Sequence, residues 1–421
     1  MIRFSSILKT IILSCIAVNM GYLLIFNIDK NMMVYLQMII AVIGIITAIL
    51  SVLVVYSRYC PIKIRKRVLM EFRKLNIYII PYLLIVLYEG LHTKSMYSYN
   101  NITLMYALTP YLYVIFSYSL SYIFIVDGSY IPFLEKISIL GIVMTIIRII
   151  GWFFYNYYRL PIFLGIVLQS PDWVRNGFQR IDVIPLYGII VVLLLSNYLK
   201  SNKLKELLML LILVVYPVFI TQVRYLTIVI LITTISMIYL KPSESSKSIF
   251  TKILLSIVLS FSVIFGVIQQ VVALFSPDSL YGPSTSVRIE AMDHFYNLVS
   301  TTGNQFSGLG YLLSWNGNAA QLLSRNIWQN YYLSDLGIFG GLVVFGLLGI
   351  VVYGLLYYLG IKSVIDNWNH GNANRIMVMG IFIYMVLSCF SLNIFDMNRA
   401  MDVHFYLAIF CYTSAKSRLE H

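Results

Sequence analysis

Residues 276–336 read SPDSLYGPSTSVRIEAMDHFYNLVSTTGNQFSGLGYLLSWNGNAAQLLSRNIWQNYYLSDL. This stretch, called the insert below, contains many polar residues and lies between two long apolar runs in a chain that is otherwise almost entirely apolar. Because such a segment adds nothing to the packing of apolar helices, we expect it to carry recognition or chemistry.

The composition predicts a membrane protein. The chain has 421 residues, of which 60% are hydrophobic and 11% are charged. A soluble domain carries about 25% charged residues, so this chain cannot cover itself with a water-exposed surface. Its repeated apolar runs are long enough to cross about 30 Å of hydrocarbon. The net charge of +13 then fits basic cytoplasmic loops rather than nucleic-acid binding.

We predict an all-α fold, a polytopic transmembrane bundle of about 12 helices with one large extracytoplasmic loop that contains short amphipathic helices. The predicted helices are residues 7–28, 32–57, 75–91, 102–126, 137–158, 183–199, 206–221, 225–240, 253–275, 337–361, 376–394 and 401–415. The first nine helices occupy residues 1–275, the insert residues 276–336, and the last three helices residues 337–421. A ten-helix arrangement stays open, since the seventh and eighth or the last two helices can form a re-entrant pair.

Basic residues predict the orientation. The strongest basic block, RYCPIKIRKRVLMEFRK (58–74), belongs in the cytoplasm by the positive-inside rule. Counting outward from it, loops 200–206, 241–252 and 362–375 are also cytoplasmic. Both termini are then cytoplasmic, and the insert lies on the outer face.

Arginine is enriched on that outer face. Of 15 lysines only Lys30 and Lys94 are placed outside, whereas seven of 15 arginines are: Arg159, Arg175, Arg180, Arg224, Arg288, Arg325 and Arg399. The guanidinium fork binds phosphate with two hydrogen bonds, which lysine cannot do. The excess therefore predicts a site for an anionic substrate. The alternative is pairing with acidic residues of the same loops, such as Asp182, Glu290, Asp293, Asp335 and Asp396, or with lipid headgroups.

Two of these arginines lie in informative contexts. Arg224 is in the tight turn TQVRYL (221–226), where its side chain can reach the depth of a lipid phosphate. Arg288 opens the amphipathic pattern SVRIEAMDHFYNLV, at a helix N-terminus suited to phosphate. For Arg288 a surface ion pair with Glu290 or Asp293 stays an equal alternative.

The rest of the insert contains candidate sugar contacts and a candidate base. The glycine-bearing loop FSGLGY (306–311) is followed by Trp315, and the run WQNYY contains Tyr331. Rings with neighbouring amides suit the apolar faces and hydroxyls of sugars. Asp335, at the start of the next helix, is a candidate general base, an arginine partner or a helix cap.

No metal centre or cofactor is predicted. The histidines are scattered, and no spacing typical of a metal site or of a nucleotide-binding loop occurs. We interpret Asp396, Arg399, Asp402 and His404 as an ion-pair cluster that holds the outer end of the last helix.

Three patches together resemble the O-antigen polymerase and ligase superfamily: TQVRYL (221–226), SVRIEAMDHF…FSGLGY (286–311) and NYYLSDLGIFGG (330–341). The resemblance implies a metal-independent glycosyltransferase of the bacterial inner membrane. Its substrates would be undecaprenyl-diphosphate-linked glycans, polymerised on the outer face into O-antigen or capsule, and a chain-length regulator protein is a further candidate partner. Outer arginines bind the diphosphate in this family, a role that carries over to Arg224 and Arg288 and secondarily to Arg175 and Arg180.

One departure favours a polymerase over a ligase. Ligases of this family carry a histidine just before the Asn-x-Tyr-Leu stretch, and here Trp328 and Gln329 occupy that place. Asp335 or His294 would then assist the acceptor hydroxyl, while Arg325, Trp315 and Tyr331 would contact the substrate. A flippase for lipid-linked oligosaccharides and a structural membrane subunit are the remaining alternatives.

Overall fold

The computed structural model describes residues 2–28, 30–58, 60–167, 173–175, 177–242, 252, 282–326, 329–396 and 399–419. The predicted helix 253–275 and the first residues of the insert, 276–281, lie outside the described residues. Within them the fold is all-α, and strands occur only as two short antiparallel hairpins.

The elements follow the predicted order. From the N-terminus they are α1 (Ile2–Met20), η1 (Tyr22–Phe26), α2 (Lys30–Tyr56), α3 (Ile62–Tyr97), α4 (Asn101–Leu112), η2 (Tyr113–Ile115), α5 (Phe116–Val126), α6 (Ile131–Tyr158), α7 (Leu164–Val167), β1 (Val174–Arg175), β2 (Phe178–Gln179), α8 (Tyr187–Ser201), α9 (Leu204–Tyr216), the π-helical turn η3 (Pro217–Thr221) and α10 (Arg224–Leu240). After the gap come α13 (Gly282–Thr301), α14 (Gly317–Leu323), β3 (Ser324–Asn326), β4 (Gln329–Asn330), η4 (Leu333–Asp335), α15 (Gly337–Phe345), α16 (Leu348–Asn369), α17 (Arg375–Cys389) and α18 (Ala400–Leu419).

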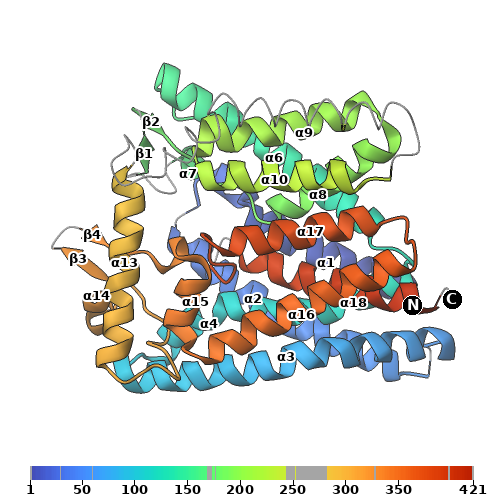
Figure 1. Ribbon diagram of the computed structural model, residues 1–421, viewed down its shortest axis with the longest axis horizontal. Coiled ribbons are helices and arrows are strands. Elements are labelled where there is room, and N and C mark those ends of the chain that lie inside the picture. Colours follow the sequence, from blue (N-terminus) through green and yellow to red (C-terminus); the bar gives the residue numbers. More distant parts are fainter. Residues whose placement is uncertain are drawn as a thin grey trace.

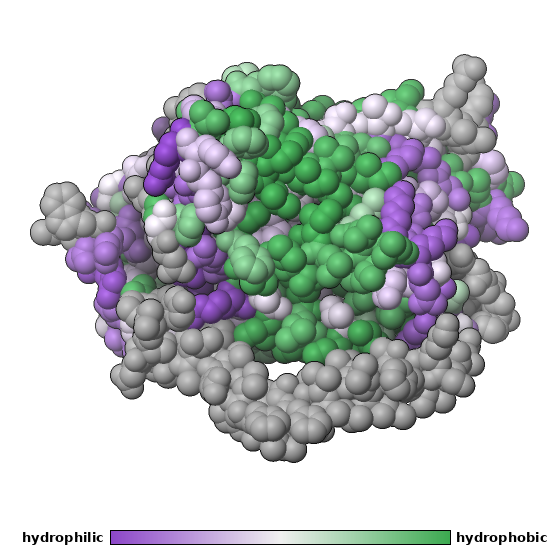
Figure 2. Space-filling model, turned by 90° about the horizontal axis from the view of Figure 1, so that it is seen from above, coloured by the Kyte–Doolittle hydropathy of each residue, from purple (hydrophilic) through white to green (hydrophobic). Residues whose placement is uncertain are grey.

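The long helices pack side by side into one bundle with two distinct ends (Figure 1). Both chain termini lie at one end, together with the basic start of α3, and the described part of the insert lies at the opposite end. Figure 2 shows a broad hydrophobic band across the middle of one face, with hydrophilic residues toward both ends. Among the described residues, six helices are long and apolar enough to cross a membrane. The arrangement is that of a membrane protein.

Helix α18 forms the centre of the bundle. All its side chains from Ala400 to Ser414 are buried, and it packs against α16, α5 and α3. A helix that is apolar on every side is stable only where it is surrounded, which explains why this segment lacks an amphipathic pattern. The first turn of α18, which carries Asp402, is thereby held inside the bundle.

Arg148 is a structural residue within the bundle. Its side chain is buried in α6, and its two terminal nitrogens donate to the carbonyl oxygens of Met20 at 2.8 Å and Asp182 at 2.6 Å. Met20 ends α1, so its carbonyl has no partner inside that helix. Arg148 therefore joins the end of α1 to the segment before α8, which satisfies carbonyls that would otherwise be costly at this depth.

The predicted helix 337–361 is broken into α15 and α16 at Gly346. Gly346 has φ +57°, and the last carbonyls of α15 accept hydrogen bonds from the insert instead of from the next turn. The N–H groups of Leu309 and Gly310 donate to Val343 and Val344 at 2.7 Å and 3.1 Å. The helix ends here because the glycine loop of the insert provides alternative partners for these carbonyls.

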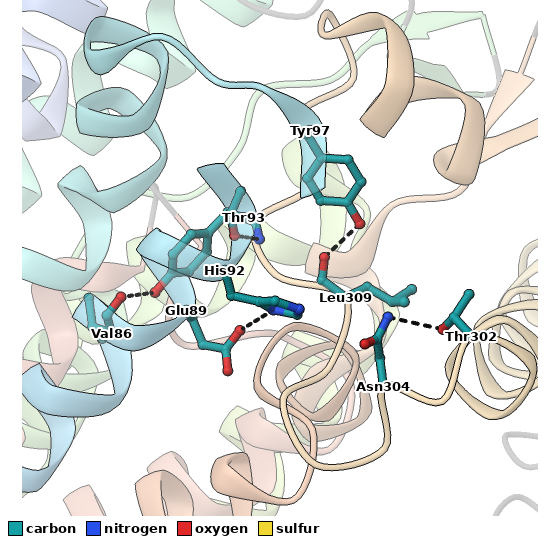
Figure 3. A network of polar contacts seen from close by, with 9 residues as sticks. Val86, Glu89, His92, Thr93, Tyr97, Thr302, Asn304 and Leu309 are labelled. Atoms are coloured by element: carbon teal, nitrogen blue, oxygen red, sulfur yellow. Dashed lines mark hydrogen bonds and ion pairs between the residues drawn. The ribbon is translucent and has the colours of Figure 1, made fainter. Parts of the chain in front are cut away.

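The outer end of α3 holds the same loop from its other side (Figure 3). The Tyr97 hydroxyl donates to the carbonyl of Leu309 at 2.7 Å, and Thr93 Oγ1 accepts from the N–H of Tyr311 at 2.9 Å. Tyr311 in turn donates its hydroxyl to Val86 at 3.1 Å. The loop FSGLGY, proposed from the sequence as a sugar contact, is thus packed between α3 and α15, and most of it is buried.

Candidate functional site

The hairpin β1–β2 carries two of the predicted arginines. Gly177 turns the hairpin with φ +78°, and Asn156 at the end of α6 fixes its second strand. The side-chain oxygen of Asn156, Oδ1, accepts the backbone N–H of Gln179 at 2.7 Å, and the side-chain Nδ2 donates to the backbone carbonyl of Gln179 at 3.2 Å. Both hairpin arginines are therefore anchored to the bundle, on the side where α9 turns into α10.

Arg175 and Arg180 bind the turn that precedes Arg224. Arg175 donates to the carbonyl of Gln222 at 2.7 Å, and Arg180 donates its Nε–H to the carbonyl of Thr221 at 2.7 Å. These carbonyls belong to the end of η3, where a π-helical turn leaves the α-helical pattern. The two arginines thus hold the backbone that presents Arg224 as the first residue of α10.

Arg180 lies among charges of both signs. It is buried, with its guanidinium 3.9 Å above the Trp173 ring. The pKa of Arg180 is lowered from 12.5 to about 10, first by burial and next by the positive charge of Arg175. Arg224 acts in the same direction with a smaller effect. The positive charges of Arg175 and Arg224 therefore reach Arg180, and a bound anion would offset them.

Carboxylates oppose this charge from three separate loops. Asp182 and Asp335 act on Arg180 in the direction that raises its pKa. They also act on Arg399. Burial alone would lower the pKa of Arg399, but the negative charges of Asp396, Asp182 and Asp335 raise it above its usual value. The structure thus joins four of the predicted outer arginines into one group, called the arginine cluster below: Arg175, Arg180, Arg224 and Arg399.

A large cavity is lined in part by Asp396, the neighbour of Arg399 of the arginine cluster. Its volume is about 1090 Å³, and its walls come from α2, α4, the insert and the loop before α18. The walls combine aliphatic side chains, such as Val34, Leu312 and Val344, with the following aromatic, amide and hydroxyl side chains: Tyr35, Tyr106, Tyr111, Tyr311, Trp315, Tyr331, Tyr332, Phe395, Asn100, Asn330, Asn393, Ser314 and Ser334. Trp315 and Tyr331, predicted as sugar contacts, are both among them. We call this space the aromatic cavity.

Asp396 connects the cavity to the arginine cluster. Asp396 lines the cavity, and its Oδ2 lies 3.8 Å from a terminal nitrogen of Arg399. The loop that carries Asp396 is fixed to η4, since the N–H of Asn393 donates to the Ser334 carbonyl at 3.0 Å. Asp335, the base candidate from the sequence, is not among the lining residues and interacts with the arginines instead.

The corner interpreted from the sequence as one ion-pair cluster keeps its two acidic residues near Arg399. Arg399 lies 3.8 Å from Asp396, and together with Asp402 it lines a separate cavity of about 30 Å³. Asp402 also accepts the N–H of Leu186 at 2.7 Å. His404 is buried in the bundle against Phe116, with ring centroids 5.5 Å apart. His404 therefore contributes to packing, and of these four residues only Asp396 lines the aromatic cavity.

Arg325 and His294 make contacts inside the insert. Arg325 forms two hydrogen bonds with Glu290, at 2.9 Å and 3.3 Å, and Tyr331 donates its hydroxyl to the same carboxylate at 2.6 Å. His294 Nε2 lies 2.9 Å from the carbonyl of Leu322, and its ring packs on Tyr331. The structure thus gives Arg325 an acidic partner, the alternative considered from the sequence, and packs His294 against Tyr331, a residue that lines the aromatic cavity.

Arg288 lies in the first turns of α13, and its side chain is partly buried. Glu290, which was considered from the sequence as its partner, is paired with Arg325. The role of Arg288 in binding the diphosphate stays a prediction from the sequence.

The cavity wall contributed by α4 was not predicted from the sequence. Asn100 caps α4 by accepting the N–H of Thr103 at 2.8 Å, and Tyr106 contacts Trp315 with ring centroids 5.6 Å apart. The sequence pattern that could have indicated this wall is a polar cap residue followed by tyrosines at one end of an apolar run.

Among the described residues no group of three acidic, histidine or cysteine side chains is arranged to hold a metal ion. Comparison of the sequence with protein-family models and with curated proteins finds no match.

Proposed function

We propose that the protein is a membrane glycosyltransferase that polymerises undecaprenyl-diphosphate-linked oligosaccharide repeat units into O-antigen, capsule or a related exopolysaccharide. The observation that carries the proposal is the convergence of Arg175, Arg180 and Arg224 from distant parts of the chain. The aromatic cavity is linked to this group through Asp396, which lines the cavity and lies 3.8 Å from Arg399. The arginines suit a diphosphate, and the aromatic cavity suits a glycan. A lipid-linked oligosaccharide combines these two groups.

The proposed topology completes this picture. Residues 253–275 would supply a further span, giving 12 in all, with both termini in the cytoplasm and the arginine cluster at the outer face of the inner membrane. Both termini and the basic start of α3 lie at the end opposite the insert (Figure 1), which supports this orientation. At the outer face the arginines would meet a diphosphate at headgroup depth.

The reaction is a displacement at an anomeric carbon. A hydroxyl of one lipid-linked unit attacks the anomeric carbon of the growing chain, the new glycosidic bond forms, and the bond to the diphosphate oxygen breaks. The hydroxyl proton leaves to a base, and undecaprenyl diphosphate departs with the bonding electron pair. Arginines held in advance around that diphosphate stabilise the charge as it develops, which is the largest contribution a protein makes to such a step.

The packing of the bundle supports an enzyme over a flippase. A flippase needs polar groups along a path through the membrane, whereas the arginine cluster lies at one end and the side chains of the central helix α18 are buried from Ala400 to Ser414. A ligase of the same superfamily would use the same charge stabilisation with a different acceptor, so the acceptor has to be tested directly.

Deletion of the gene in its source strain separates these functions. We expect single-repeat glycans to reach the cell surface while long chains disappear, as read on a gel of surface glycans. Loss of all glycan from the surface would indicate a flippase. Retention of long chains on undecaprenyl diphosphate would indicate a ligase. Complementation with the wild-type gene restores the ladder in each case and serves as the control.

A further inference from the structure

We infer that the aromatic cavity binds the glycan of the acceptor and that Asp396 is the residue that takes the proton from the attacking hydroxyl. This inference rests on the proposed function, and it assigns the two sides of the site to different substrates. The arginine cluster holds the donor diphosphate, and the aromatic cavity holds the incoming repeat unit.

Beside its aliphatic residues, the cavity lining has an aromatic and polar part that suits a glycan. Rings from α2, α4 and the insert offer flat apolar faces, while amides and hydroxyls between them offer hydrogen bonds to sugar hydroxyls. Trp315 and Tyr332 are 59% and 65% exposed, so their rings are accessible to a ligand. A lipid tail would gain nothing from the asparagines and serines of the lining.

The size of the cavity fits several sugar rings. Pockets for drug-sized molecules range from about 300 to 1,000 Å³, and this cavity, at about 1090 Å³, is at the upper limit. An oligosaccharide repeat unit is larger than a single sugar, so the volume matches a repeat unit. The cavity also extends from the insert to α2, which leaves room for a chain of rings rather than one.

The position of Asp396 assigns the acceptor to this cavity. In a direct displacement the nucleophile approaches the anomeric carbon from the side opposite the leaving group. If the diphosphate lies among the arginines, the hydroxyl arrives from the other side. Asp396 lines the cavity and contacts Arg399 of the arginine cluster at 3.8 Å, so its carboxylate lies at the boundary between the two.

The step balances with these groups alone. The acceptor oxygen forms the bond to the anomeric carbon as its proton moves to the Asp396 carboxylate. The bond from the anomeric carbon to the diphosphate oxygen breaks, and its electron pair stays on the diphosphate. Asp335 does not line the cavity, and its charge acts on Arg180 and Arg399, so the proton is assigned to Asp396 instead.

Chain extension by the purified protein in liposomes tests the inference. The donor is the lipid-linked repeat unit of the source strain. The probe is a soluble oligosaccharide made by partial hydrolysis of the strain's own polysaccharide, which lacks a diphosphate and can only accept. Its KM and kcat are measured for Trp315→Ala, Trp315→Phe, Asp396→Asn and Asp396→Glu. Tyr296→Ala and Asp293→Asn serve as matched controls, since both residues are exposed on α13 and neither lines the cavity.

The two kinds of variant should affect different constants. Trp315→Ala should raise the KM for the probe about tenfold through loss of the apolar ring face, with kcat little changed, and phenylalanine should restore most of the affinity. Asp396→Asn should lower kcat about 10²-fold or more with the KM unchanged, and glutamate should recover part of the rate. The control variants should behave as wild type.

The outcomes separate this inference from the proposed function. If wild type extends the probe and Arg224→Ala does not, while Asp396→Asn keeps normal kcat or Trp315→Ala keeps normal KM, the inference is wrong and the proposed function stands. If wild type transfers no sugar, the proposed function itself fails. Should Asp396→Asn not fold, as judged by its melting temperature, Asp396→Glu and the exposed Trp315 variants decide the matter.

Discussion

Replacement of Arg224 by alanine should abolish long glycan chains in a strain that depends on this gene. Arg224 is the first residue of α10, where Arg175 and Arg180 fix the backbone that carries it. Loss of one positioned donor to a developing negative charge typically lowers kcat by about 10²–10³-fold. Few chains would then grow beyond one repeat. The measurement is the glycan ladder from a deletion strain complemented with each variant at equal protein level.

Arg325 supplies a matched control on the same outer end. Its guanidinium is paired with Glu290, so Arg325→Ala should leave the ladder close to that of wild type. Arg224→Lys should also impair activity, because a lysine cannot form the paired hydrogen bonds of the guanidinium fork. Arg288→Ala should resemble Arg224→Ala if Arg288 completes the diphosphate site from α13. Normal ladders from Arg224→Ala, or equal losses from Arg224→Ala and Arg325→Ala, would contradict the assignment.

Replacement of Gly308 by alanine should strongly destabilise the protein. Gly308 has φ +72°, and a Cβ there would lie 2.5 Å from both the Val344 carbonyl oxygen and the Gly346 nitrogen. These are backbone atoms at the break between α15 and α16, which cannot move without losing the hydrogen bonds of the insert loop. Left-handed strain and overpacking together should cost roughly 3 kcal/mol or more.

Gly303 provides the comparison that isolates the contact. It has nearly the same backbone angle, φ +71°, but nothing lies within 4 Å of its Cβ position. Gly303→Ala should therefore cost only about 1 kcal/mol, the strain of the left-handed region alone. Thermal unfolding of both variants in detergent measures the difference. Equal melting temperatures would mean that the insert loop is not packed against α15 as described.

The helices were predictable because the membrane imposes a simple rule on them. Each spanning segment needs about 20 apolar residues, and the predicted ranges in the described part of the chain correspond to helices of the structure. The break at Gly346 was not predictable, since it depends on carbonyls of α15 that bind Leu309 and Gly310 of the insert. The length of α3 beyond its apolar part was missed as well, because its polar start continues the same helix.

The site was predictable in its residue types and not in its geometry. The excess of outer arginine pointed to a cationic site, and Arg175, Arg180 and Arg224 do come together. Their proximity depends on the hairpin β1–β2 reaching the α9–α10 turn, which no sequence pattern indicates. The same holds for Asp396, which was interpreted from the sequence as part of a structural ion-pair cluster. Its position at the wall of a cavity depends on how α2, α4 and the insert come together, which the sequence does not show.

Reconstitution tests the central claim, that this chain itself joins lipid-linked repeat units, most directly. Purified protein in liposomes is supplied with the undecaprenyl-diphosphate-linked repeat unit of the source strain as the only substrate, and products are separated on a gel. The account predicts a ladder of chains longer than one repeat and release of undecaprenyl diphosphate in proportion to the bonds formed, with neither product from Arg224→Ala. A correctly folded wild-type protein that leaves the repeat unit unchanged, or only moves it across the bilayer, would contradict it.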